Sequence, residues 1–211
     1  MKYYDISPLI SDRIGVFPGD QPFERTVTMS VDDGQHMGLS AIQSTLHLGA
    51  HADAPNHYGP AQSGIDQVPV DRYLGKCQVI TAMSREGRIY PEGLSSEIEA
   101  PRVLFKTNSF PDPDQWNSDF VALSPELIRW AHKKGVFLFG IDTPSVDPES
   151  SKKLESHQAL LETKSAVLEG LVLTEVPDGV YYLSALPLRI ENADASPVRA
   201  VLWSTTDSEF L

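Results

Sequence analysis

The stretch HLGAHADAPNH, residues 47–57, places three of the six histidines of this chain and an aspartate within eleven positions. Imidazole nitrogens and a carboxylate are ligands that zinc and other first-row divalent metals accept. Gly49 relieves the steric limits on a turn, so that His51 can return towards His47. Asp53 follows His51 by two residues and lies on the same side of an extended segment. We predict that His47, His51 and Asp53 bind a metal; the alternative is a polar surface loop.

Two donors far along the chain extend this prediction. His157 lies on the apolar stripe of a helix predicted over residues 150–163. Glu169 interrupts the apolar run 166–173, where an unpaired buried carboxylate is costly and needs a cation, a metal or a proton. The alternative for His157 is a core histidine with satisfied hydrogen bonds, and the alternative for Glu169 is a salt bridge. Because the motif needs further donors, we predict that both residues are ligands.

The number and type of donors indicate a catalytic centre. With His57, the candidates number six, whereas one tetrahedral zinc takes about four ligands. Either one candidate is not a ligand, or two metals share a carboxylate, for which Asp53 and Glu169 are both suitable. The only cysteine, Cys77, is predicted to be a small buried side chain rather than a ligand. Sites of histidine and carboxylate with open positions are typical of catalysis.

The pattern along the chain predicts a mixed, strand-rich α/β fold in a single domain of residues 1–211. Ser124 and Pro125 begin a helix that Gly135 ends, and a second helix covers 150–163. The Pro-, Asp- and Asn-rich stretch 108–118 is predicted to be a long surface loop. Strands are predicted over residues 26–31, 39–47, 77–82, 102–107, 136–141, 167–173, 180–186 and 198–203.

Composition limits the class of protein. Of 211 residues, 41% are hydrophobic and 22% charged, as in ordinary globular proteins. Seventeen Lys and Arg against 29 Asp and Glu give a net charge of -12, and no basic cluster exceeds two residues, which argues against nucleic acid or an anionic membrane as a partner. No apolar run approaches the roughly 20 residues of a membrane helix, and the N-terminal residues do not resemble a signal peptide. With a single cysteine, we expect a cytoplasmic protein.

The sequence resembles the bacterial kynurenine formamidases, a branch of the cyclase-like metal hydrolase family. The HxGxHxDxPxH core is shared by the wider superfamily, and the other segments point to the formamidase branch. The matching segments are DIS at 5–7, FPGD at 17–20, HLGAHADAPNH at 47–57, GIDTPS at 140–145, LEGL at 168–171 and DASPVRA at 194–200.

The resemblance implies a swivelling β/β/α fold, a homodimer and two zinc ions per subunit. One zinc would be held by His47, His51 and Asp53. The other would be held by Asp53, His157 and Glu169, and His57 would be the proton donor and acceptor. Phe17 occupies the position where the family usually has a substrate-contacting tryptophan, so it retains the aromatic face but lacks the indole N–H. Ordinary core packing is the alternative for Phe17.

The implied reaction is hydrolysis of N-formyl-L-kynurenine to L-kynurenine and formate. The zinc pair would make hydroxide available near neutral pH, and His57 would protonate the departing arylamine. The alternative for His57 is a third ligand to the first metal. Two other functions stay open: a related hydrolase that opens a cyclic amide such as isatin, with manganese as an alternative metal, and a non-catalytic metal-binding scaffold.

Overall fold

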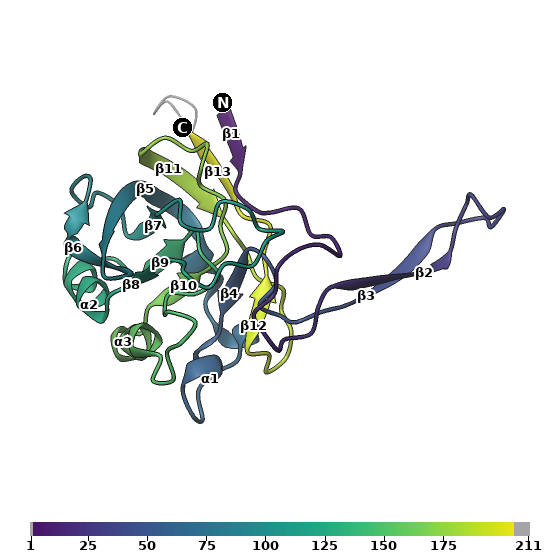
Figure 1. Ribbon diagram of the computed structural model, residues 1–211, viewed down its shortest axis with the longest axis horizontal. Coiled ribbons are helices and arrows are strands. Elements are labelled where there is room, and N and C mark those ends of the chain that lie inside the picture. The colour runs from purple at the N-terminus through teal and green to yellow at the C-terminus, as the bar shows by residue number, and fades with distance from the viewer. Residues whose placement is uncertain (1, 205–211) are drawn as a thin grey trace.

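A large mixed sheet organises the protein, whose computed structural model describes residues 2–204 (Figure 1). The order of its strands is β1 (Lys2–Asp5), β13 (Val201–Ser204), β11 (Gly179–Ser184), β5 (Leu74–Arg85), β7 (Arg102–Lys106), β9 (Leu138–Ile141) and β10 (Ala166–Leu168). Strands β5, β7, β9 and β10 run parallel to one another, whereas β1, β13 and β11 are antiparallel to their neighbours. Two further strands extend the sheet from β5: β6 (Arg88–Leu94) pairs with β5, and β8 (Ala122–Leu123) pairs with β6.

The two faces of this sheet are covered differently. Helices α2 (Pro125–Lys133) and α3 (Glu155–Thr163) pack on the face that carries Val103 and Phe105. Leu104 points to the opposite face, as alternation along a strand requires. That face is covered by the alanine-rich segment around β4 (His51–Asp53), which pairs with β12 (Ala195–Pro197). The result is a β/β/α arrangement, which confirms the predicted mixed, strand-rich α/β class.

Strands β2 (Glu24–Met29) and β3 (Leu39–Gln43) form an arm that projects from the body (Figure 1). Every residue of β3 is exposed, so the alternation in this segment does not mark a buried face. The prediction of a strand over 39–47 was wrong at its end, because pairing with β2 stops at Gln43. His47 therefore lies in the loop that returns to the body.

Helix α2 confirms its predicted signals: Ser124 Oγ accepts from the Leu127 N–H at 2.9 Å and Gly135 follows the helix with a φ of +94°. Helix α3 begins at Glu155 rather than at 150, because Leu154 has a φ of +50° and Ser151 Oγ accepts its N–H. Strand β10 ends at residue 168, before the turn that the site requires.

Several short elements were not predicted, namely β1, β4, β6, β8, β12, helix α1 (Pro55–Tyr58) and the 3-10 helices η1 (Ile65–Gln67) and η2 (Val70–Tyr73). Residues 108–118 form neither helix nor strand, as predicted, and Cys77 is buried. Within residues 2–204, no helix combines the length and apolar character that crossing a membrane requires.

Candidate metal centre

The backbone itself joins the two distant parts of the candidate site. The N–H of His51 donates to the Glu169 carbonyl at 3.1 Å, and the N–H of Glu169 donates to the His51 carbonyl at 3.0 Å. This reciprocal pair connects β4 to the segment that follows β10. The side chains meet as well, since His51 Nε2 lies 3.3 Å from Glu169 Oε2. Both residues are 2% exposed.

Two glycines with positive φ permit this close approach. Gly170 has a φ of +64°, and a Cβ there would lie 2.0 Å from the carbonyl oxygen of Gly49. Gly49 has a φ of +56°, consistent with the turn predicted for it. The chain therefore leaves the sheet after Leu168 and brings Glu169 against His51.

His157 reaches the same centre from the first turn of α3. Its Nδ1 lies 2.9 Å from Asp147 Oδ2, and Asp147 also accepts the backbone N–H groups of Ser156 and His157 at 3.0 Å. Asp147 thus satisfies the open N–H groups of the helix and orients the imidazole. His157 Nε2 then faces the two central carboxylates, 3.3 Å from Asp53 Oδ2 and 3.5 Å from Glu169 Oε1.

His47 and His57 also lie beside Asp53. His47 Nδ1 lies 3.0 Å from Asp53 Oδ1, and its Nε2 lies 3.0 Å from Asp194 Oδ2. The ring centroids of His47 and His57 are 4.2 Å apart, and His57, on α1, is exposed. Two sets therefore have ligand atoms close enough for one ion: His47, Asp53 and His57, and His51, Asp53 and Glu169. Asp53 belongs to both.

The division of ligands that the resemblance implies stays a prediction. His47 Nδ1 and His51 Nε2 both approach Asp53 Oδ1, at 3.0 and 3.4 Å, while His51 also approaches Glu169 and the His57 ring lies beside that of His47. The other five candidates all lie around Asp53. Both sequence-based roles for His57, proton transfer and ligation, fit its position.

The electrostatics of the cluster suit a dication. Although burial disfavours the charged imidazole, the nearby carboxylates of Asp53 and Glu169 raise the pKa of His47 to about 9. Burial and Asp53 both oppose ionisation of Glu169, yet the nearby imidazoles of His157 and His51 hold its pKa below the ordinary value. Two buried carboxylates thus keep their charge and attract positive charge.

Two atoms in the cluster lack hydrogen-bond partners. His51 Nε2 and Asp53 Oδ1 are buried and, although they lie 3.3 Å from Glu169 Oε2 and 3.0 Å from His47 Nδ1, respectively, neither contact has the geometry of a hydrogen bond, and no other described residue supplies one. Leaving buried polar atoms unpaired costs about 1–3 kcal/mol each. A metal ion would satisfy both at once, so the residues fit a metal.

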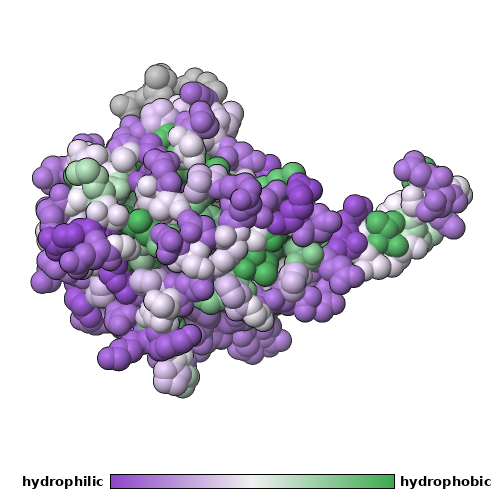
Figure 2. Space-filling view, in the orientation of Figure 1, coloured by the Kyte–Doolittle hydropathy of each residue, from purple (hydrophilic) through white to green (hydrophobic). Residues whose placement is uncertain are grey.

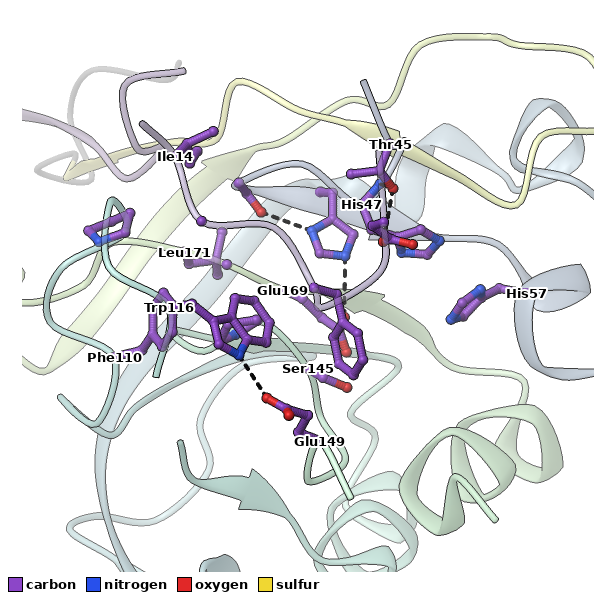
Figure 3. Close-up of a pocket in the computed structure, with 18 of the residues that line it drawn as sticks. Ile14, Thr45, His47, His57, Phe110, Trp116, Ser145, Glu149, Glu169 and Leu171 are labelled. Atoms are coloured by element: carbon purple, nitrogen blue, oxygen red, sulfur yellow. Dashed lines mark hydrogen bonds and ion pairs between the residues drawn. The ribbon is translucent and has the colours of Figure 1, made fainter. Parts of the chain in front are cut away.

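A cavity of about 410 Å³ opens onto the cluster (Figure 3). Phe17 lines its wall, where 36% of the residue is exposed, so it is not buried in the core. The Phe17 ring packs edge-on against Trp116 with centroids 5.4 Å apart. Trp116 donates its indole N–H to Glu149 Oε2 at 2.7 Å. One side of the cavity therefore offers metal ligands and another offers aromatic rings.

Comparison with known proteins identifies the family. A family model described as "Putative cyclase" matches residues 4–148. The chain is 44% identical over 203 residues to the kynurenine formamidase of Bordetella petrii, covering 95% of this chain and 97% of that protein. The chain belongs to the cyclase family.

Solved structures agree with this cyclase-family membership. A potential metal-dependent hydrolase with cyclase activity has a TM-score of 0.83 and 25% identity, covering 97% of this chain and 98% of that one. Isatin hydrolase A from Labrenzia aggregata has a TM-score of 0.77 and 21% identity, covering 97% and 94%, and shows the fold alone. The predicted cyclase-like fold is confirmed.

Sequence reasoning missed three residues of this cyclase-family site: Asp147, Asp194 and Trp116. A histidine that binds metal usually gives its other nitrogen to a carboxylate, and this rule could have prompted a search for Asp147 and Asp194. Trp116 had no such signal, because it lies in the loop 108–118. Its loop is tied to the N-terminal segment where the Gly15 N–H donates to the Pro113 carbonyl at 2.8 Å.

Proposed function

We propose that this protein is a metal-dependent hydrolase that converts N-formyl-L-kynurenine to L-kynurenine and formate. The observation that carries the proposal is the cavity in which the histidine and carboxylate cluster faces aromatic side chains. The likeness to a kynurenine formamidase over 95% of the chain supports the same substrate. The substrate is an aryl formamide, so it needs both chemistries in one cavity.

We propose two zinc ions per subunit, with Asp53 shared between them. The donor set of imidazole nitrogens and carboxylate oxygens suits zinc, with manganese as the alternative. His47, His51, Asp53, His157 and Glu169 are the proposed ligands. When bound, the metal supplies Lewis-acid chemistry, polarising the amide carbonyl and lowering the pKa of water.

We assign proton transfer to His57. Its side chain forms no hydrogen bond to another residue in the described range, so a ring nitrogen is available to substrate. Desolvation, together with the charges of His47 and His157, holds the pKa of His57 below its ordinary value despite the carboxylates nearby. A neutral imidazole at pH 7 can accept a proton and return it to the arylamine that leaves.

The aromatic wall orients the other half of the substrate. The rings of Phe17, Trp116 and Phe110 line the cavity, and the ring centroids of Phe110 and Trp116 are 5.8 Å apart. Aromatic contacts of this kind hold an aryl ring at little entropic cost. The formyl group, which is bonded to the aryl nitrogen, then faces the metal cluster.

The direct test is release of kynurenine from N-formyl-L-kynurenine by the zinc-loaded protein, with and without a chelator. We expect turnover that the chelator abolishes and added zinc restores. Isatin, assayed in parallel, separates the related activity: rapid isatin opening with negligible formamide hydrolysis would reject the proposal. Bound zinc without any hydrolysis would indicate a scaffold.

His57→Ala separates the two roles of that residue. If His57 transfers protons, turnover falls by about 10²- to 10⁴-fold while metal content stays at the wild-type level. Loss of metal from the variant would instead make His57 a ligand. Metal content by mass spectrometry of the purified protein gives the answer independently of activity.

We also propose that the protein is a homodimer, with the β2–β3 arm in the interface. Figure 2 shows apolar surface on the arm away from the body, and Val27, Leu39 and Ile42 are 53%, 53% and 71% exposed. Exposed apolar clusters of this kind mark association surfaces. Light scattering should give a dimer for the wild type, and Ile42→Arg should shift it towards monomer without loss of folded structure.

A further inference from the structure

The cavity carries a pair of opposite charges that the metal chemistry does not use. Glu149 and Lys152 both line it, and both belong to the loop between β9 and α3. Among the described residues, Lys152 is the sole lysine or arginine lining this cavity. Glu149 lies beside Trp116 rather than in the cluster around Asp53 (Figure 3), and Lys152 follows it by three residues in the same loop.

The carboxylates that line this cavity differ in how many of their oxygens already have a hydrogen-bond or charge partner. Asp142 accepts the N–H groups of Thr107 and Asn108 at 2.9 Å, and Asp194 lies against His47. Glu149 uses only Oε2, for the indole of Trp116. Its Oε1 forms no hydrogen bond within residues 2–204 and is open to a cationic ligand beside Trp116.

Lys152 is likewise uncommitted. Its ammonium forms no ion pair and no hydrogen bond with another residue in the range 2–204. A lysine in an otherwise acidic cavity normally pairs with a neighbouring carboxylate, and this one is open to an anionic ligand.

The loop that carries both residues is held firmly. Asp147 binds Arg88 at 3.1 Å and the first turn of α3, and the Ser151 N–H donates to the Pro148 carbonyl at 2.9 Å. Ser151 Oγ also donates to Glu155 Oε2 at 2.8 Å. These contacts hold the backbone of the loop, and the Trp116 indole holds the Glu149 carboxylate, which lowers the cost of binding; the exposed Lys152 side chain can move to meet a ligand.

We propose that Glu149 and Lys152 recognise the zwitterionic amino-acid end of the substrate: Glu149 Oε1 accepts from the α-ammonium and Lys152 donates to the α-carboxylate. The inference rests on the proposed function and states which part of the substrate the cavity would recognise. The aryl ring lies against Phe17 and Trp116, and the amino-acid chain extends from it towards the loop. Formanilide and isatin lack this end and gain nothing from the pair.

The test compares substrates with and without the charged end. For Lys152→Ala, we expect kcat/KM for N-formyl-L-kynurenine to fall about tenfold, mainly through KM, while the value for formanilide changes less than about twofold. Lys153→Ala, the neighbouring lysine that does not line the cavity, is the matched control and should behave like wild type. Equal losses on both substrates would overturn the inference.

Glu149→Gln isolates the ammonium contact, because the amide oxygen can still accept from Trp116. We expect weaker use of N-formyl-L-kynurenine but unchanged use of its analogue without the α-amino group. Tryptophan fluorescence shows whether the Trp116 contact persists in the variant. A loss of equal size on the analogue would contradict the assignment.

Binding of L-kynurenine by calorimetry keeps this inference distinct from the proposed function. If the protein hydrolyses no aryl formamide, the proposed function fails. The recognition of the amino-acid end still holds if wild type and Lys153→Ala bind L-kynurenine and Lys152→Ala binds it about tenfold more weakly. Absent binding by wild type, or equal binding by all three proteins, would overturn it.

Discussion

Asp147 Oδ2 lies 2.9 Å from His157 Nδ1 and also accepts the His157 backbone N–H at 3.0 Å. The same carboxylate therefore caps α3 and fixes the direction of the imidazole. Because Nδ1 is engaged, Nε2 is the nitrogen directed at Asp53 and Glu169. The geometry of the candidate centre thus depends on a residue that touches neither Asp53 nor a metal position.

Asp147→Asn tests this dependence. The amide is neutral beside Arg88 and has a single acceptor oxygen for the groups that both carboxylate oxygens of Asp147 now serve. We therefore expect about a 10- to 100-fold loss of zinc affinity and about 3 kcal/mol less stability. Competition with a chromophoric chelator measures the affinity, and urea unfolding measures the stability. Asp33→Asn, in the exposed turn of the arm, is the control. Unchanged zinc affinity in Asp147→Asn would contradict the role.

Metal removal should lower thermal stability, because it leaves His51 Nε2 and Asp53 Oδ1 buried without hydrogen bonds among the described residues. Zinc at a hundredfold excess over its Kd stabilises by about 2.7 kcal/mol, which corresponds to about 5–11 °C in Tm for a chain of this size. Scanning calorimetry with chelator and then with zinc restored measures the shift. Asp53→Asn removes the shared carboxylate and should show no comparable zinc-dependent rise; a full rise in that variant would argue against the assigned centre.

Gly170→Ala should disrupt the junction between β4 and the segment after β10. Its φ of +64° disfavours a side chain, and the new Cβ would collide with the Gly49 carbonyl. We expect a loss of about 3–5 kcal/mol in urea unfolding. Gly135→Ala has a comparable backbone (φ +94°) but open space around it, so it should cost only about 1–2 kcal/mol. Equal costs would show that the close contact is unimportant.

Asp178 should make stability sensitive to acid. Although burial opposes its ionisation, hydrogen bonds from the Thr81 hydroxyl at 2.6 Å and N–H at 2.8 Å lower its pKa from 3.8 to about 2. The unfolded chain then binds more protons between these values, so the contribution is complete above about pH 4 and is lost as pH falls towards 2.

Asp178→Asn should remove this acid-sensitive contribution. We expect about 2 kcal/mol less stability at pH 7 and a difference from wild type that shrinks on acidification below pH 4. Urea unfolding across this range measures it. Glu162→Gln, from an exposed pair with Arg129, should change stability little at any pH. A difference that stays constant down to pH 2 would disprove the effect.

The sequence by itself determined the features that depend on neighbours along the chain. Ser124, Pro125 and Gly135 specify the ends of α2 through contacts within a few residues. The spacing of residues 47–57 gathers several donors in the same way, and the apolar surroundings of His157 and Glu169 in the sequence extended the prediction to these two residues. Strand ends were less accurate, because the end of β3 depends on where pairing with β2 stops.

Only the tertiary structure decided how the distant parts meet. The approach of Glu169 to His51 comes from a backbone pair that needs two positive-φ glycines in contact. Trp116 and Glu149 join one cavity although each lies in a segment without a local pattern. The alternation in β3 looked like a buried strand and is an exposed arm. Local sequence fixes backbone preference and spacing, whereas burial and the partners of a side chain depend on long-range packing, which adjacent residues do not encode.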